Sequence, residues 1–115
     1  MYDMDSNTIK NISNNLRTGS ISCLELTKEY LAKSQAHQNL NIFLTYNEKA
    51  EEQAKKIDDL IATDSDIFNK KALLGLPFAL KDNFLSKGIR TTASAKVLDN
   101  YIPSYESTVS QRLLD

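Results

Sequence analysis

Residues 73–88, "LLGLPFALKDNFLSKG", contain the most apolar run of the chain. Gly75 and Pro77 interrupt any helix through this point. The bulky residues that follow suit a strand that is buried on both faces, as in a parallel or mixed sheet. Lys81 and Asp82 then lie at the carboxyl end of that strand. The stretch therefore predicts an α/β protein.

Three helices are expected before this stretch. Ser6 or Asn7 can cap a first helix, and Gly19 ends it in a position suited to a left-handed cap. A second helix begins with a capping box, in which Ser22 is followed three residues later by a glutamate. Residues 48–62 have apolar side chains at helical spacing and opposite charges four residues apart, which predicts a third, amphipathic helix.

Two strands and a last helix complete the prediction. Residues 42–46 alternate in the manner of a short strand, and residues 78–80 form the buried strand. The polar segment 63–71 is expected to be a surface loop. A final helix is expected to start near Ser104, with three apolar residues facing inward: Val109, Leu113 and Leu114. The predicted fold class is thus α/β, a mixed β-sheet core flanked by helices, and this piece is mostly helical with about two strands.

The composition excludes several classes of function. The 115 residues carry 14 Lys and Arg against 15 Asp and Glu, and they contain no basic stripe that could follow a phosphate backbone. The longest apolar run, 72–80, is too short to span a membrane. We therefore expect a cytoplasmic protein that binds neither a membrane nor, directly, a nucleic acid.

Neither a metal site nor a cofactor site is predicted in this chain. Cys23 and His37 are its only cysteine and histidine, so they cannot form a metal cluster or a disulfide framework. We expect Cys23 to be a small buried hydrophobe and His37 to interact with the dipole at the end of its helix. The three glycines are too scattered to form a phosphate-binding loop.

Lys81 is the candidate catalytic residue, and two interpretations of it remain open. A lysine at the end of a strand is commonly a surface group whose ammonium reaches water. A lysine that burial has stripped of water is instead easier to deprotonate, and it can then act as a general base. The apolar residues before Lys81 make the second interpretation possible.

The motif around this lysine resembles the amidase signature family. In that family the strand has the form glycine, any residue, proline, three residues, lysine, aspartate, and it carries the catalytic lysine. Here the pattern is matched by Gly75, Pro77, Lys81 and Asp82. The resemblance extends over residues 73–114. It is strongest to members that act in tRNA-dependent amidotransferases, because this chain shares with them the asparagine after Asp82, the paired threonines, a later lysine and the run "YIPSYESTV".

The resemblance implies a mechanism for the complete protein. A neutral lysine, acting through a second serine held by a cis peptide bond, takes the proton from a nucleophilic serine, which attacks the amide of glutamine. Lys81 is the one catalytic residue that this chain would supply. The implied partners are glutamine as amide donor, two further subunits, B and C, and glutamyl-tRNA through the complex. ATP and magnesium would be bound by a partner subunit, where the ammonia is used.

The chain also differs from the family pattern. Both catalytic serines of the family lie in a glycine- and serine-rich segment beyond the lysine, and no such segment follows here. Arg90 stands where the family commonly has a proline. We therefore expect residues 1–115 to be the N-terminal part of a single amidase domain, inactive when isolated. A stand-alone amidase of the same family and a non-catalytic helical interaction module are the alternatives.

Overall fold

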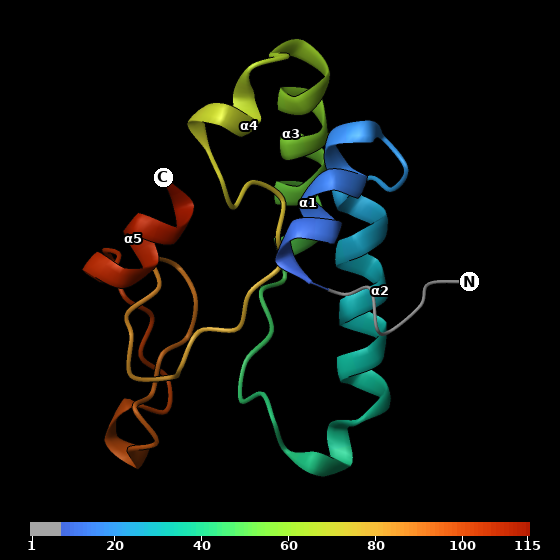
Figure 1. Ribbon diagram of the computed structural model, residues 1–115. Helices are drawn as coiled ribbons and strands as arrows, with labels where there is room; N and C mark the ends of the chain where they lie inside the picture. Colours follow the sequence, from blue (N-terminus) through green and yellow to red (C-terminus); the bar gives the residue numbers. More distant parts are fainter. Residues whose placement is uncertain (1–7) are drawn as a thin grey trace. The chain divides into compact units, whose positions relative to one another are not determined.

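The computed structural model describes residues 8–115, which divide into two compact units. The first, called here the helical unit, consists of the described residues up to His37 together with Glu48–Pro77. The second, the loop unit, consists of Gln38–Asn47 and Phe78–Asp115. Of the five α-helices in the described residues, four belong to the helical unit. They are labelled in Figure 1. Each unit is described by itself below.

The first helix, α1, spans Ile9–Thr18. Its N-cap is Thr8, whose side-chain oxygen accepts a hydrogen bond of 3.2 Å from the backbone N–H of Asn11. The predicted caps, Ser6 and Asn7, lie outside the described residues. The predicted end is confirmed, because Gly19 follows the helix with a φ of 72° and its N–H bonds the last turn.

The second helix, α2, spans Cys23–Ala36, and the predicted capping box is present. The N–H of Glu25 donates to Oγ of Ser22 at 3.1 Å, and the Glu25 carboxylate accepts from the Ser22 N–H at 2.9 Å. His37 is the C-cap residue, and its ring Nδ1 lies 2.8 Å from the carbonyl oxygen of Lys33. The expected position of His37 at the helix end is therefore confirmed.

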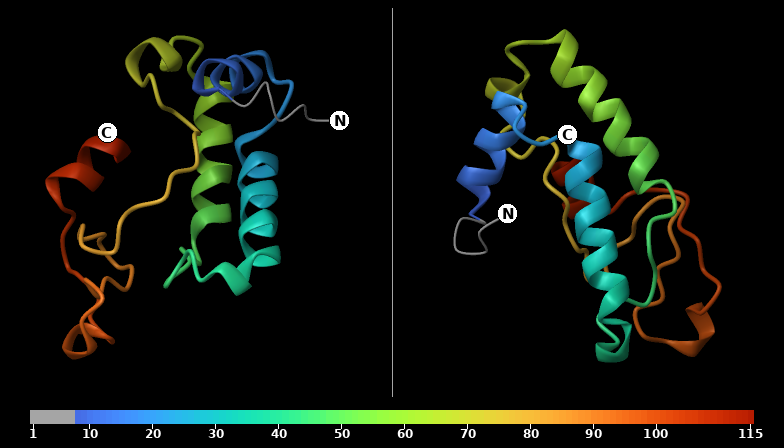
Figure 2. Two further views of the ribbon diagram at one scale, coloured as in Figure 1. Left: turned by 60° about the horizontal axis from the view of Figure 1, so that its bottom comes forward. Right: turned by 90° about the vertical axis from the view of Figure 1, so that its right-hand side faces the viewer.

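The third helix, α3, spans Ala50–Thr63 and runs antiparallel to α2, side by side with it (Figures 1 and 2). The predicted third helix is thus confirmed to within two residues at its start. One side chain of α3 also caps α2 from a distance in sequence. The carboxylate of Asp58 accepts hydrogen bonds from the backbone N–H groups of Cys23, at 2.7 Å, and Leu24, at 3.0 Å. Asp58 therefore fixes the α2–α3 pair at the end where α2 begins.

Replacing Asp58 by alanine is expected to lower the free energy of unfolding of the helical unit by about 1.5–3 kcal/mol, the range for hydrogen bonds to charged groups. The two N–H groups at the start of α2 would lose their acceptor and the negative charge that the helix dipole favours. Urea unfolding followed by circular dichroism measures the loss. Asp59→Ala on the same helix is the matched control, because Asp59 is exposed. Equal losses in both variants would contradict this role of Asp58.

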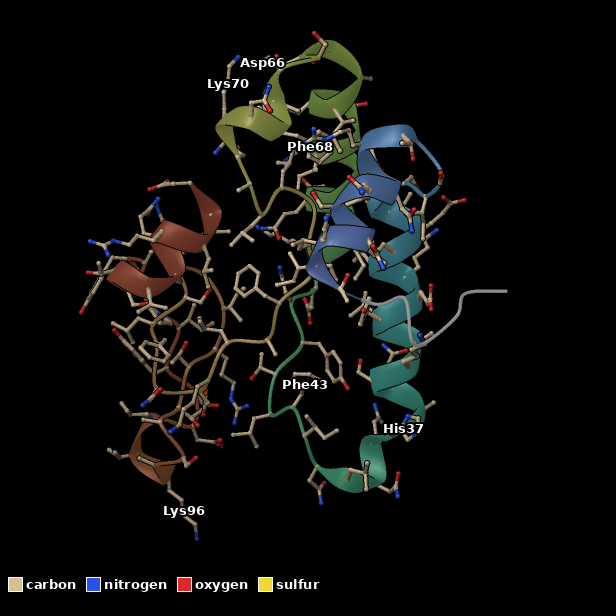
Figure 3. The ribbon with its side chains drawn as sticks, viewed as in Figure 1. His37, Phe43, Asp66, Phe68, Lys70 and Lys96 are labelled. Carbon is tan, nitrogen blue, oxygen red and sulfur yellow. The ribbon has the colours of Figure 1, made fainter. Side chains whose placement is uncertain are left out.

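The segment 63–71 is not the polar surface loop that its composition predicts. It contains a short helix, α4 (Ile67–Lys70), whose Ile67 and Phe68 are both buried. Figure 3 shows Phe68 on the side of α4 that faces α1, where the Arg17 guanidinium lies 5.3 Å from the centre of its ring. The prediction was wrong because two apolar residues among many polar ones carry no periodicity, although they are enough to anchor a turn of helix.

One buried core holds the helical unit together, and α1–α4 all contribute to it. Leu26 lies at its centre, with 0% of its surface exposed. Gly75 lies against this core with a φ of +77°, and a Cβ at this position would be 3.1 Å from Cδ1 of Leu16. A side chain there would be strained by the backbone conformation and would also press against Leu16. The buried core residues are Ile12, Leu16, Cys23, Leu26, Ala54, Ile67 and Phe68.

The described part of the loop unit contains no β-strand, only one isolated bridge between Ser86 and Ile89. Both predicted strands, 42–46 and 78–80, are therefore wrong for this chain, and Phe78, expected to be buried, is 50% exposed. The residues have strand-like composition, but a strand needs a second one to satisfy its N–H and C=O groups. Within residues 8–115, neither segment pairs with another.

Arg90 joins two distant segments of the loop unit instead. Its Nη1 donates to the carbonyl oxygen of Leu44 at 3.3 Å and to Oγ1 of Thr45 at 3.1 Å. Its Nε and Nη2 donate to the backbone and the carboxylate of Asp99, next to the 3-10 helix η3 (Lys96–Leu98). The segment that follows the 3-10 helix η2 (Gln38–Leu40) is thereby held in this unit.

The last helix, α5, spans Thr108–Leu114 and so begins four residues later than predicted. Ser107 is its N-cap and accepts a hydrogen bond of 3.1 Å from the Ser110 N–H, while the Ser107 N–H donates to the carbonyl oxygen of Leu85. These bonds make Ser107 the N-cap, so the helix begins at Thr108 and not near Ser104. The prediction of its inward face is also wrong, since three apolar residues are exposed: Val109, Leu113 and Leu114.

The candidate active-site segment around Lys81

Lys81 lies at the start of the longer segment of the loop unit, in irregular backbone. Its carbonyl oxygen accepts a hydrogen bond of 3.0 Å from the N–H of Phe84, which closes a tight turn directly after the lysine. The Lys81 side chain is exposed, so the buried environment expected from the predicted strand is not present in this chain. The catalytic role of Lys81 stays a prediction.

Asp82, the next residue, forms the most extensive polar network of this segment. Its carboxylate accepts hydrogen bonds from the backbone N–H of Thr92, at 2.9 Å, and from the Thr92 hydroxyl. The N–H of Ser94 is a third donor, at 3.4 Å. The backbone carbonyl of Asp82 accepts a further hydrogen bond of 2.7 Å from the N–H of Ala93. Both the side chain and the main chain of Asp82 therefore bind the same short turn.

That turn, residues 92–95, has an unusual backbone. Ala93 and Ser94 have φ values of 48° and 58°, in the left-handed region that residues with a side chain rarely adopt. The turn is closed by a hydrogen bond of 2.9 Å from the N–H of Ala95 to the carbonyl of Thr92. Two consecutive left-handed residues without glycine persist only where their surroundings hold them. Here the donors of the turn converge on Asp82.

The charge of Asp82 is stabilised by the same network. Partial burial alone would raise the pKa of the Asp82 carboxyl, but the hydrogen bonds from Thr92 and Ser94 lower it more. The positive charge of Arg90 acts in the same direction. The pKa of Asp82 therefore lies below its usual value, and the carboxylate form is the one that the turn binds.

Further backbone contacts hold the segment in place. The N–H of Thr91 donates to the carbonyl of Tyr101 at 3.0 Å, and the N–H of Gly88 donates to the carbonyl of Pro103 at 2.9 Å. Thr91 and Thr92 are both buried, with Thr92 only 4% exposed. Lys96, shortly after the turn, is exposed and points away from the ribbon (Figure 3). The paired threonines are thus part of the interior of the loop unit.

Cys23 has the structural role that its position in the sequence predicts. It is 2% exposed in the core of the helical unit, and its thiol lies 3.5 Å from the carbonyl oxygen of Gly75. Burial, with the nearby charge of Asp58, raises the pKa of the Cys23 thiol to about 11. A thiol of this kind is mostly protonated at neutral pH and is therefore a poor nucleophile.

Sequence reasoning missed two polar side chains of the loop unit. The first is Asp82, whose partners lie ten and twelve residues further along the chain, a separation that no local pattern marks. The second is Ser110, 1% exposed, whose hydroxyl oxygen lies 2.8 Å from the carbonyl oxygen of Leu85 and 2.6 Å from the Glu106 carboxylate, the two acceptors within reach of its one proton. The signals for Asp82 were its place in the family motif and its position directly after the candidate lysine, and neither of them indicated its partners.

Comparison with known proteins identifies the family. The family model described as Amidase matches residues 25–115, and the chain therefore belongs to the amidase family. Curated relatives bear the name of the A subunit of glutamyl-tRNA(Gln) amidotransferase. The relative from Prochlorococcus marinus strain NATL2A is 39% identical over 110 residues, which are 94% of this chain and 22% of that protein.

Two further relatives with the same name give a similar result. That from Oenococcus oeni is 36% identical over 114 residues, 98% of this chain and 23% of its own length. That from Francisella tularensis strain OSU18 is 42% identical over 110 residues, 93% of this chain and 22% of its own length. The chain thus spans between a fifth and a quarter of the length of these relatives. No solved structure matches it.

Among residues 8–115, no helix is both long and apolar enough to cross a membrane. Over the same range, no three side chains of the metal-binding types His, Cys, Asp and Glu come together as a potential metal site.

Proposed function

We propose that the full-length protein carrying this chain is the glutamine-hydrolysing subunit of a tRNA-dependent amidotransferase. The observation that carries the proposal is an identity of 36–44% to proteins named as the A subunit of glutamyl-tRNA(Gln) amidotransferase, over 85–98% of this chain. The same stretch contains the lysine motif of the amidase signature, with Lys81 and Asp82 at its end. In this proposal the whole chain is the N-terminal part of one amidase domain with an α/β core.

The proposed chemistry assigns one step to this chain. Lys81, as the neutral amine, takes a proton through a bridging serine from the nucleophilic serine, and that serine attacks the carboxamide carbon of glutamine. The C–N bond then breaks, and ammonia leaves with a proton returned along the same relay. Water hydrolyses the acyl-enzyme to release glutamate. Both serines would lie in the rest of the protein, so the isolated 115-residue chain would be inactive.

A neutral lysine at this position requires that other residues shield its amine from water, and residues 8–115 do not shield it. Lys81 is exposed here, and Phe78, just before it, is half exposed. We propose that the remaining part of the amidase domain covers both residues, because removing water from an amine favours its uncharged form. The exposed apolar residues before Lys81 are the surface against which this cover would pack.

The proposed partners follow from the same assignment. Subunits B and C would complete the amidotransferase, and glutamyl-tRNA would reach the complex through them. ATP and magnesium would bind to the partner subunit that activates the tRNA-bound glutamate, which then reacts with the ammonia. The location would be the cytoplasm.

The test is to purify the full-length protein and to ask what it requires for activity. We expect co-purification with two further subunits, glutaminase activity, and conversion of glutamyl-tRNA(Gln) to glutaminyl-tRNA(Gln) that depends on ATP. A lone protein that hydrolyses simple amides would instead support a stand-alone amidase. Glutaminase activity of the purified 115-residue chain itself would contradict the proposed division of the site.

A further inference from the structure

We propose that Asp82 is a positioning residue for Lys81. By binding the turn 92–95, Asp82 fixes the backbone to which the catalytic lysine side chain is attached. The inference rests on the proposed function, since it assumes that Lys81 is the base. It concerns a residue that makes no contact with the reacting atoms and acts only through its neighbour.

The first observation is that Asp82 binds the turn through both its side chain and its main chain. Its carboxylate accepts from the Thr92 N–H at 2.9 Å, from the Thr92 hydroxyl and from the Ser94 N–H at 3.4 Å. Its carbonyl accepts from the Ala93 N–H at 2.7 Å. Because side chain and main chain are both held, neither the position nor the orientation of the Asp82 peptide can change without breaking bonds to the turn.

The second observation is that the turn depends on these bonds. Ala93 and Ser94 adopt left-handed conformations, at φ values of 48° and 58°, which are unfavourable for residues with a Cβ. The N–H of Ala93 donates to the Asp82 carbonyl. The N–H of Ser94 is shared between the Thr92 hydroxyl oxygen, at 3.1 Å, and the Asp82 carboxylate, at 3.4 Å. The strained turn and Asp82 therefore stabilise each other as one cooperative element.

The third observation connects this element to Lys81. The carbonyl of Lys81 bonds the N–H of Phe84 at 3.0 Å, so the peptide between Lys81 and Asp82 lies between two fixed groups. The side chain of Lys81 keeps its own torsions, but the point from which it starts is fixed. A general base must reach its proton partner within hydrogen-bond distance, and a misplacement of about 1 Å can cost about 10²-fold in rate.

An ion pair with Lys81 would be a different role for Asp82, and the contacts do not support it. Among residues 8–115, Asp82 takes part in no ion pair shorter than 4.0 Å. The acceptor positions of its carboxylate are directed to the donors of Thr92 and Ser94. Its effect on Lys81 is therefore transmitted through the backbone.

The test uses the full-length protein assembled with its partner subunits, and glutamine hydrolysis as the reaction. Asp82→Asn keeps the shape but puts an NH₂ donor where the turn also presents donors. We expect kcat to fall by about 10–100-fold, while KM for glutamine stays within about twofold. Ser110→Ala is the matched control, because it removes buried hydrogen bonds from the same unit at a side chain that makes none to Asp82 or to the turn 92–95. It should leave kcat within about twofold.

A second pair of variants tests the same contact where Asp82→Asn does not assemble. Thr92→Val removes the hydroxyl that donates to Asp82 and accepts from the Ser94 N–H, whereas Thr92→Ser keeps it. We expect about a tenfold loss of kcat in the valine variant and near-normal kcat in the serine variant. Equal kcat in both would overturn the inference.

The remaining outcomes separate this inference from the function on which it rests. Normal kcat in Asp82→Asn, or an equal loss in Ser110→Ala, together with an inactive Lys81→Ala enzyme, would overturn the positioning role and leave the proposed function standing. A wild-type protein without glutaminase activity, or full activity in Lys81→Ala, would overturn the proposed function and the positioning role with it.

Discussion

Replacing Lys81 by alanine in the full-length protein is expected to lower kcat for glutamine hydrolysis by about 10²–10⁴-fold, the contribution of a well-placed general base. Alanine cannot accept the proton that the nucleophilic serine must lose, and no other lysine occupies the position that matches the family motif. The fold should be unaffected, because Lys81 is an exposed side chain in this chain. Steady-state glutaminase assays with the assembled protein, with circular dichroism as the measure of fold, give the result.

Lys87→Ala is the matched control for this experiment. Lys87 is another exposed lysine of the same unit, six residues further along the chain, so its loss changes the net charge by the same amount. We expect the Lys87 variant to keep its activity. Near-normal turnover of Lys81→Ala with a native circular dichroism spectrum would instead mean that Lys81 is only a surface group, the alternative that its sequence position leaves open.

The helices could be predicted from the sequence because their determinants are local. Ser22 and Glu25 form the capping box within one turn of helix, and Gly19 adopts the left-handed conformation that its position after α1 indicates. The link from Asp58 to the start of α2 could not be predicted in this way. It joins residues 34 and 35 positions apart, and it exists only because α2 and α3 pack side by side.

The strands could not be predicted reliably, since composition shows only that a segment suits a sheet. Residues 42–46 alternate as a strand should, yet Arg90 binds their backbone at Leu44, and no neighbouring strand is present within the described residues. α5 shows the same limit on a smaller scale, because the carbonyl of Leu85 helps to set where the helix begins. Each of these outcomes depends on a partner that is distant in sequence.

The candidate site shows the same division between local and distant information. Lys81 could be singled out from its motif, whereas its neighbour Asp82 gained a role only when Thr92 and Ser94 were seen to bind it. The sequence also could not predict the exposure of the residues before Lys81, for which its pattern indicated burial. A buried strand must be covered on both faces, and the residues that would cover it cannot be identified from the strand itself.

The backbone of residues 78–80 is therefore expected to exchange its amide hydrogens rapidly in the isolated 115-residue chain. Within the described residues, the N–H groups of Phe78, Ala79 and Leu80 have no hydrogen-bond partner, so solvent reaches them without any opening of the structure. Exchange should be close to the rate of an unfolded peptide. Amides of α2 that follow its first turn, next to the buried Leu26, should be protected by at least about 10²-fold, which makes them the internal reference.

The full-length protein should show the opposite behaviour at the same residues. If 78–80 become the buried strand of an α/β core, their N–H groups gain partners on a neighbouring strand, and covering Phe78 and Leu80 adds about 1.5–3 kcal/mol for each side chain fully buried. Protection there should then rise by at least about 10²-fold over the isolated chain, with little change around Leu26. Hydrogen exchange measured on dilute samples of both proteins makes the comparison. Strong protection of 78–80 in the dilute 115-residue chain would show that this chain already covers the strand by itself, and it would remove the physical reason for placing the rest of an amidase domain over Lys81.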